Sequence, residues 1–263
     1  MEASRPLGAA VSGHLTRRDA VRWLGGTAAV FGAMTLAGCG MTPVAGAYTG
    51  KGSTAVKLSV AAPSKPASMF SVQDGTYTLV GRGAGIGAGA NGNVDDLSYY
   101  FEQVNVDGTW SCYVEHVGGT KNDGGLAFGG LMARTSAAPD AQNVAVMVTD
   151  GNGVLFEWRQ ANGQGEEQYP MQLAIGVTAP IWVRLQKSGS AWYVSYSQNN
   201  GKTWPNVLKT IVPFDEGKPF LVGLAATSHD VGAEVLDVFK DVKGFAPNQY
   251  ISIAPKPGSA TAS

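Results

Sequence analysis

The sequence predicts an all-β protein whose main domain is an antiparallel β-sandwich. β-Branched and aromatic residues fall in short runs in which apolar and polar residues alternate, which is the pattern of half-buried strands. Turn-forming residues separate these runs, and the chain contains 36 glycines and 13 prolines. No long helical pattern competes after the first 38 residues. Two packed antiparallel sheets are therefore expected, each burying one face.

Ten alternating runs are the predicted strands of this sandwich. In chain order they cover residues 77–82, 97–105, 109–117, 126–134, 143–149, 154–160, 181–187, 192–197, 220–227 and 234–242. Hairpin-type connectors join several of them: Asp107-Gly108, residues 150–153 and residues 188–190. Because no helical segment separates the runs, parallel βαβ units are not expected.

The N-terminus has the layout of an export signal. Arg17 and Arg18 precede an uncharged stretch, residues 23–38, that is rich in Gly, Ala and Leu. A helix over this stretch reaches about 24 Å, short of the ~30 Å hydrocarbon core, so a permanent membrane span is disfavoured. The arginine pair resembles the twin-arginine motif S/T-R-R-x-F-L-K, although Ala20 stands where a bulky apolar residue is usual.

The signal ends in a segment that resembles a bacterial lipobox, Leu36 to Cys39. Cys39 is therefore the predicted lipidation site, and we expect a protein anchored in the cell envelope, on the periplasmic or cell-surface side of a membrane. An ordinary signal peptide with an incidental cysteine is the alternative. The second cysteine, Cys112, lies in an alternating run and is interpreted as a buried small hydrophobe.

Composition divides the chain into four parts. Residues 1–38 are the signal, and residues 39–67 are a tether rich in Ala, Gly, Ser, Thr and Pro, in which residues 56–60 are a further candidate strand. Residues 68–245 are the sandwich domain, and residues 246–263 are predicted to be a flexible tail.

Charge excludes one class of partner. The formal net charge is −1, and no cluster of Lys and Arg follows the signal. Such a chain does not neutralise a row of phosphates, so nucleic acid is not an expected partner.

Five segments, taken in order and with their spacing, resemble one family. They are residues 130–134, 154–159, 182–185, 197–204 and 222–225. The family is a bacterial domain-of-unknown-function family of concanavalin A/laminin-G-like β-sandwich domains, often attached to secreted carbohydrate-active proteins. The resemblance implies a jelly roll of the concanavalin A-like lectin/glucanase type, with a concave face that relatives use for sugars. Carbohydrate binding is therefore an expectation by analogy with relatives of this fold, because a fold does not fix a function.

Motifs that would indicate catalysis are sparse. Glucanases of this broad fold carry E-x-D-x-x-E on one strand, and that string is absent here, while Glu102, Glu115 and Glu157 lie on separate predicted strands. Residues 197–204 resemble a single Asp-box with Asn199 in place of the aspartate, which predicts a structural hairpin. The G-x-G-x-x-G string at residues 87–92 precedes an aromatic strand rather than a helix, so it is interpreted as a loop.

Sugar binding requires an exposed aromatic ring to stack on a pyranose and polar groups to read its hydroxyls. Arg134, Trp158, Arg159 and Tyr193 are the predicted ligand-binding residues, and no catalytic residue is predicted. Alternation places Trp158 and Arg159 on opposite faces of a strand, so at most one of them lines a given surface. The alternative for each is a place in the core or at its rim.

No cofactor is predicted apart from a structural calcium ion, which oxygen ligands suit. The loop aspartates that suggest it are Asp95, Asp96, Asp123, Asp150 and Asp230.

The predicted function is that of a lipid-anchored, non-catalytic module that binds a polysaccharide or another glycan. A structural or protein-interaction lipoprotein of the envelope is one alternative. A glycoside hydrolase is the other, and it requires two carboxylates about 5 to 9.5 Å apart across a groove.

Overall fold

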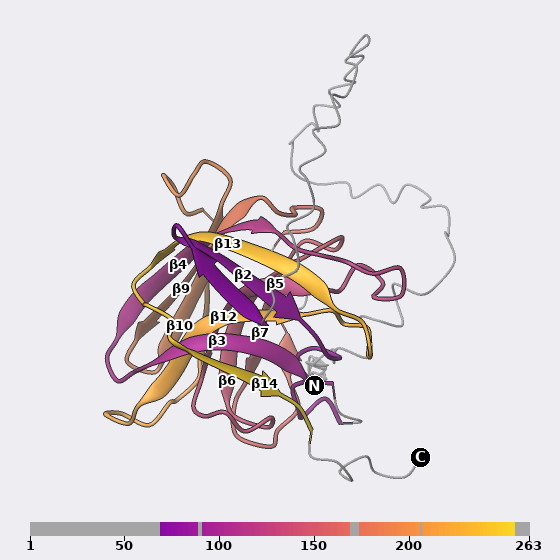
Figure 1. Cartoon of the computed structure of the whole chain (residues 1–263). Coiled ribbons are helices and arrows are strands. Elements are labelled where there is room, and N and C mark those ends of the chain that lie inside the picture. Colours follow the sequence, from indigo (N-terminus) through magenta and orange to yellow (C-terminus); the bar gives the residue numbers. More distant parts are fainter. Residues whose placement is uncertain (1–68, 89–90, 169–173, 206, 256–263) are drawn as a thin grey trace, which may run out of the picture.

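In a computed structural model, which describes residues 69–88, 91–168, 174–205 and 207–255, the chain folds into two seven-stranded antiparallel sheets (Figure 1). Sheet I has the order β1-β2-β13-β4-β9-β10-β11. Its strands are β1 (Phe70–Gln73), β2 (Thr76–Gly81), β4 (Gly108–His116), β9 (Ile181–Ser188), β10 (Ala191–Ser197), β11 (Leu208–Ile211) and β13 (Val235–Lys243).

Sheet II has the order β14-β3-β12-β5-β6-β7-β8. Its strands are β3 (Leu97–Val104), β5 (Phe128–Arg134), β6 (Asn143–Thr149), β7 (Val154–Arg159), β8 (Glu167–Gln168), β12 (Phe220–Thr227) and β14 (Gln249–Ile253). All ten predicted runs form strands, so the all-β class and the jelly-roll-like antiparallel sandwich are confirmed.

The main core lies between the two sheets, where alternate side chains of facing strands meet. Trp110 and Cys112 of β4 and Trp192 of β10 face Leu131 of β5 and Leu224 of β12. Cys112 is fully buried, and burial raises the pKa of its thiol. The interpretation of this cysteine as a core residue is confirmed.

The connectors confirm two predicted hairpins and correct a third. Residues 150–153 join the paired strands β6 and β7, and residues 188–190 join the paired strands β9 and β10. Asp107-Gly108 is not a hairpin, because β3 and β4 lie in different sheets. The Asp107 carboxylate instead accepts hydrogen bonds from Lys187 Nζ and Gly189 N, each at 2.6 Å, so it holds a neighbouring turn.

The predicted tail also requires a correction. Residues 249–253 form β14, which pairs with β3 along its length and buries Ile253. This strand has only five residues and lies among polar and Pro-rich residues, so no clear alternating run marks it in the sequence. The folded part therefore extends past residue 245.

A second, smaller cluster lies on the outer face of sheet II. Ile86, from the segment between β2 and β3, packs there with Tyr99, Met132 and Met147. Every residue of β5 and β6 is consequently buried, although alternation alone predicts one exposed face. β5 and β6 also lie close together here. A Cβ on Gly130 would lie 2.2 Å from Val146 O, so only glycine fits at position 130.

The predicted export signal, Cys39 and the tether with residues 56–60 lie outside the described residues. Within the described ranges, no helix is long and apolar enough to cross a membrane.

Candidate functional site

Two of the four predicted ligand-binding residues, Arg134 and Arg159, are fully buried in one ion-pair network. They end β5 and β7, and both guanidinium groups meet the buried carboxylate of Asp95. Asp95 Oδ2 lies 3.1 Å from Arg134 Nη1, and Asp95 Oδ1 lies 2.6 Å from Arg159 Nη2. Glu166 Oε2 lies 3.0 Å from Arg159 Nη2. Both side chains have no exposed surface, which agrees with the alternative of a place in the core and leaves neither open to direct contact with a sugar.

Burial and charge act on this network in opposite directions. Burial raises the pKa of Glu166 well above its usual value, although the Arg159 guanidinium opposes that rise. Burial alone would lower the pKa of Arg159, but the carboxylates of Glu166 and Asp95 outweigh it and raise that pKa. Each buried charge therefore depends on its partners, and removing one partner leaves an uncompensated charge in the interior.

The network also positions the two loops that begin where the arginines end their strands. Arg134 Nε donates a hydrogen bond to Ser136 O at 2.8 Å in the β5–β6 loop. Arg159 Nε donates one to Gln164 O at 3.0 Å in the β7–β8 loop. Arg134 and Arg159 thus hold the backbone of these two loops.

The remaining two predicted residues lie elsewhere. Trp158 is half-buried against the core between the sheets, with its ring 4.8 Å from that of Phe156, and its Nε1 donates to Glu167 Oε2 at 3.0 Å. It faces away from Arg159, as alternation predicted. Tyr193 lies on β10 of the other sheet. The four residues therefore do not form one site.

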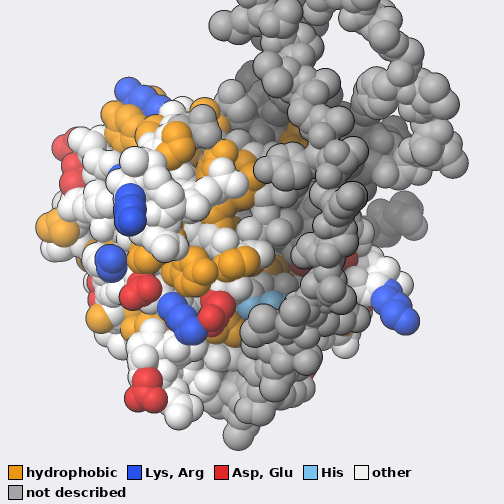
Figure 2. All heavy atoms as spheres, turned by 90° about the horizontal axis from the view of Figure 1, so that it is seen from above, with side chains coloured by type: hydrophobic (Ala, Val, Ile, Leu, Met, Phe, Trp, Pro, Cys, Tyr) orange, Lys and Arg blue, Asp and Glu red, His pale blue; other side chains and the backbone are white. Residues whose placement is uncertain are grey.

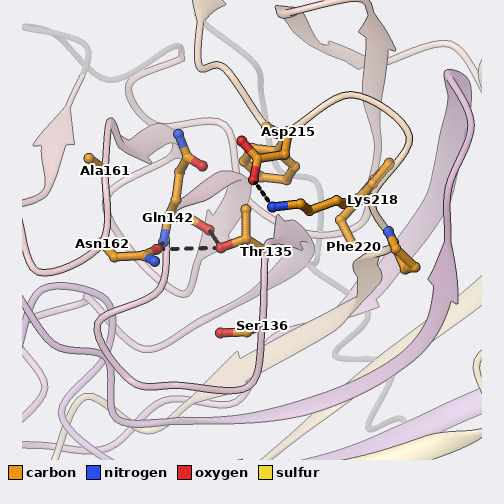
Figure 3. A pocket seen from close by; sticks show the side chains of 10 residues that line it. Thr135, Ser136, Gln142, Ala161, Asn162, Asp215, Lys218 and Phe220 are labelled. Atoms are coloured by element: carbon orange, nitrogen blue, oxygen red, sulfur yellow. Dashed lines mark hydrogen bonds and ion pairs between the residues drawn. The ribbon is translucent and has the colours of Figure 1, made fainter.

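A cavity of about 350 Å³ lies where the β5–β6 and β7–β8 loops meet the connection from β11 to β12 (Figure 3). The three segments line it with hydroxyl, amide and aromatic side chains and one exposed ion pair. The lining residues are Thr135, Ser136, Gln142, Ala161, Asn162, Phe214, Asp215, Lys218, Pro219 and Phe220. We refer to this cavity as the loop pocket.

Hydrogen bonds tie the three segments of the loop pocket together. Asn162 Oδ1 accepts from Gln142 N at 2.8 Å and from Thr135 Oγ1 at 3.4 Å, which joins the β7–β8 loop to the β5–β6 loop. Gln142 Nε2 donates to Gln160 O at 2.7 Å and to Pro213 O at 3.4 Å, which adds the third segment. The walls are therefore preorganised.

The apolar part of the loop pocket is continuous with the main core. Phe214 and Phe220 meet edge to face with ring centroids 5.5 Å apart, and Trp192 lies 4.9 Å from Phe214. Both phenylalanines are almost fully buried. The core thus fixes the aromatic side of the pocket.

Two polar side-chain atoms of the loop pocket have no hydrogen-bond partner among the described residues. They are Asn162 Nδ2 and Gln142 Oε1, a donor and an acceptor. Figure 3 shows Asn162, Gln142 and Thr135 on one side, and Asp215 and Lys218 on the other. Lys218 Nζ and Asp215 Oδ2 lie 2.6 Å apart at the exposed rim. The pocket can therefore read a neutral group that both donates and accepts.

The loop aspartates that suggested calcium are mostly hydrogen-bonded within the protein. Asp123 accepts from Thr120 N at 2.6 Å and Gly125 N at 2.7 Å, and Asp230 accepts from Thr120 Oγ1 at 2.9 Å. Burial and the Asp123 carboxylate raise the pKa of Asp150 to about 6. In the part of the chain that the structure describes, no three acidic, His or Cys side chains are grouped to hold a metal.

Sequence reasoning missed the loop pocket because its polar residues lie in three separate loops. Gln142 and Asn162 lie outside the alternating runs, and neither belongs to a motif. The one available signal was indirect, because Arg134 and Arg159 stand immediately before the two loops.

Known proteins resemble this chain in fold rather than in sequence. No family model and no curated protein matches the sequence. A functionally unknown protein from Saccharomyces cerevisiae is similar in structure, with a TM-score of 0.50 and 18% identity over 73% of this chain and 95% of that chain. This likeness agrees with the double-sheet fold. The family named by resemblance stays a prediction.

Two more distant structures come from bacilli. The GH43 protein BlXynB from Bacillus licheniformis has a TM-score of 0.43 and 12% identity, over 65% of this chain and 33% of that chain. The carbohydrate-binding module CBM66 from Bacillus subtilis has a TM-score of 0.34 and 13% identity, over 65% of this chain and 82% of that chain. This chain therefore spans a third of the Bacillus licheniformis protein.

Proposed function

We propose that this protein is an exported, lipid-anchored and non-catalytic module that binds a carbohydrate in the loop pocket. The observation that carries the proposal is a pair of amide groups without a hydrogen-bond partner among the described residues, Asn162 Nδ2 and Gln142 Oε1, beside a buried aromatic wall. Export and anchoring rest on Arg17, Arg18 and Cys39 in the sequence.

The chemistry of the loop pocket suits a sugar better than an ion. A sugar hydroxyl donates and accepts hydrogen bonds at once, and its C–H faces pack on aromatic rings. The pocket offers amide and hydroxyl groups on a preorganised frame, with Phe214 and Phe220 as a buried apolar wall behind them. The two charged residues among its described lining, Asp215 and Lys218, already neutralise each other. Its volume of about 350 Å³ falls at the lower end of ligand sites, which suits a chain end or a short stretch of glycan.

Binding without hydrolysis is favoured by the carboxylates. Glycoside hydrolysis uses two carboxyl groups that flank the bond. The loop pocket is lined by one, Asp215, and it pairs with Lys218. Asp95 and Glu166 come together elsewhere, but both are buried and bound to Arg159.

Calorimetric titration with neutral di- to hexasaccharides of glucose, xylose, mannose and galactose tests the proposal. The variant Asn162→Asp keeps the Oδ1 acceptor that holds the loops and removes the free Nδ2 donor. We expect it to weaken binding about tenfold, the effect of one lost hydrogen bond with its partner left unsatisfied.

Asn105→Asp is the matched control. It makes the same chemical change at an exposed position outside the lining of the pocket, so binding should be unchanged. Equal loss in the two variants, or no saccharide bound by the unaltered protein, would contradict the proposed function.

A further inference from the structure

The outer face of sheet I carries three cations that each lie over an aromatic ring. Arg184 Cζ lies 4.5 Å from the ring centroid of Trp204, and Lys243 Nζ lies 4.7 Å from that of Trp182. Lys209 Nζ lies 5.7 Å from the ring of Tyr193. We call these six residues the cationic strip. Figure 2 shows the molecule from above the view of Figure 1, and on that face Lys and Arg side chains lie among hydrophobic ones.

Strand alternation and one hairpin assemble the cationic strip. Alternate residues of β9 point inward, such as Val183 in the main core, so Trp182 and Arg184 point outward. The Asp-box hairpin between β10 and β11 then folds Trp204 edge-on against Trp182, with ring centroids 6.4 Å apart. Asn199 takes the aspartate's place in that hairpin, because its Oδ1 accepts from Thr203 N at 3.0 Å.

The three cations of the strip have no carboxylate partner among the described residues. The neighbouring Lys240, by contrast, lies 2.7 Å from Glu115 Oε1. Arg184 donates from Nε to Ser195 Oγ at 3.0 Å, which leaves its two terminal nitrogens available. A guanidinium presents these nitrogens as a fork that matches a carboxylate.

The cationic strip crosses the sheet from β13 to β11. Four strand spacings separate these strands in the order β13-β4-β9-β10-β11, which amounts to about 19 Å. A surface of this length with charges spread along it suits an extended polymer rather than one small anion. This surface is separate from the loop pocket, and the inference does not depend on that pocket.

We propose that the cationic strip binds an acidic polysaccharide, with uronate carboxylates on Arg184, Lys243 and Lys209 and sugar rings against Trp204 and Tyr193. Both rings are half-buried and lie along the sheet. Each of these cations lies against an aromatic ring, and a uronate chain offers the matching pair, since each of its rings carries a charge next to an apolar face.

Two other occupants fit less well. β13, β4, β9 and β10 have strand partners on both sides, so a peptide can add as a new strand only beside β11, at one end of the strip. A bilayer surface would favour protruding apolar side chains, and the most exposed large apolar residues, such as Val231 and Ile175, are not part of the strip.

Affinity electrophoresis of the full chain in gels containing polygalacturonate tests the inference, with the carboxyl-reduced form of the same polymer as the uncharged probe. The double variant Arg184→Gln/Lys243→Gln should reduce retention by polygalacturonate at least tenfold, because it removes two of the three cations. The unaltered protein should bind the carboxyl-reduced polymer at least tenfold more weakly. Retention should also fall steeply with added salt.

Matched controls distinguish binding at the cationic strip from an effect of net charge and from binding in the loop pocket. Arg82→Gln/Lys121→Gln removes the same charge at exposed positions off the strip and should stay within twofold of the unaltered protein. Asn162→Asp should leave polygalacturonate binding intact, so the two proposals can fail separately.

Three outcomes would overturn the inference. One is equal retention by the charged and the uncharged polymer, and another is full retention of the Arg184→Gln/Lys243→Gln variant. The third is tighter binding of poly-glutamate or of phosphatidylserine vesicles than of polygalacturonate. A melting-temperature measurement on each variant verifies that it is folded.

Discussion

Three arginines, each on a β-strand, differ in burial, and contact with a residue far away in the sequence decides the difference. Arg134 and Arg159 meet Asp95, which precedes them by 39 and 64 residues, and this contact buries them. Arg184 meets no carboxylate in the described part of the chain and stays partly exposed over Trp204. Nothing local in the sequence separates these cases, because each arginine stands in an alternating strand. The contact that decides comes from a segment far away in the chain.

Replacing Asp95 with Asn should destabilise the protein by about 3 kcal/mol or more, because two buried guanidinium groups lose their shared carboxylate. Urea unfolding of the full chain measures this loss. Asp107→Asn is the control, since its pair with Lys187 is partly exposed and should contribute less than about 1 kcal/mol. Similar losses in both variants would show that the buried network does not hold the fold.

The edge strands of both sheets are the elements that the sequence patterns did not predict. β1, β8, β11 and β14 are the outermost strands of the two sheets, and none coincides with a predicted run. They have two to five residues, too few for alternation to stand out from a loop. Pairing with a neighbouring strand creates them.

The contribution of the edge strand β14 to stability can be tested, because its Ile253 packs into the cluster on the outer face of sheet II. Ile253→Ala should lower the free energy of unfolding by about 2 kcal/mol or more. Ser252→Ala, one residue earlier and exposed, should change it by less than about 0.5 kcal/mol. If urea unfolding finds both variants within 0.5 kcal/mol of the unaltered protein, roughly the limit for surface changes, β14 is not part of the cooperative fold.

The whole molecule combines two surfaces on one sandwich. The loop pocket lies among connections at the end of the sheets, whereas the cationic strip lies on the outer face of sheet I. The outer face of sheet II is occupied by the chain's own Ile86 and by the Asp95 network. Both proposed binding sites, the loop pocket and the cationic strip, therefore lie on surfaces that these residues leave open.

The proposed anchor applies to the whole molecule and predicts where the protein fractionates. Cys39→Ala should release it from the membrane fraction into the soluble fraction of the host cell, because the lipid-bearing sulfur is gone. Cys112→Ala should remain with the membranes, because that thiol is buried in the core. Immunoblots of separated fractions check both, and a Cys39→Ala variant that stays with membranes would show that another feature holds it there.

Sequence patterns alone predicted the all-β class, the ten longer strands, two of the hairpins and the buried state of Cys112. These follow from local rules, since alternation and turn residues act over a few positions. The tertiary structure alone decided which strands share a sheet, so that Asp107-Gly108 became a crossing rather than a hairpin. It also decided which polar residues face solvent, because Arg134 and Arg159 are buried by Asp95, while Asn162 and Arg184 are brought to open surfaces. Such contacts join residues that are far apart in the chain, and no local pattern encodes them.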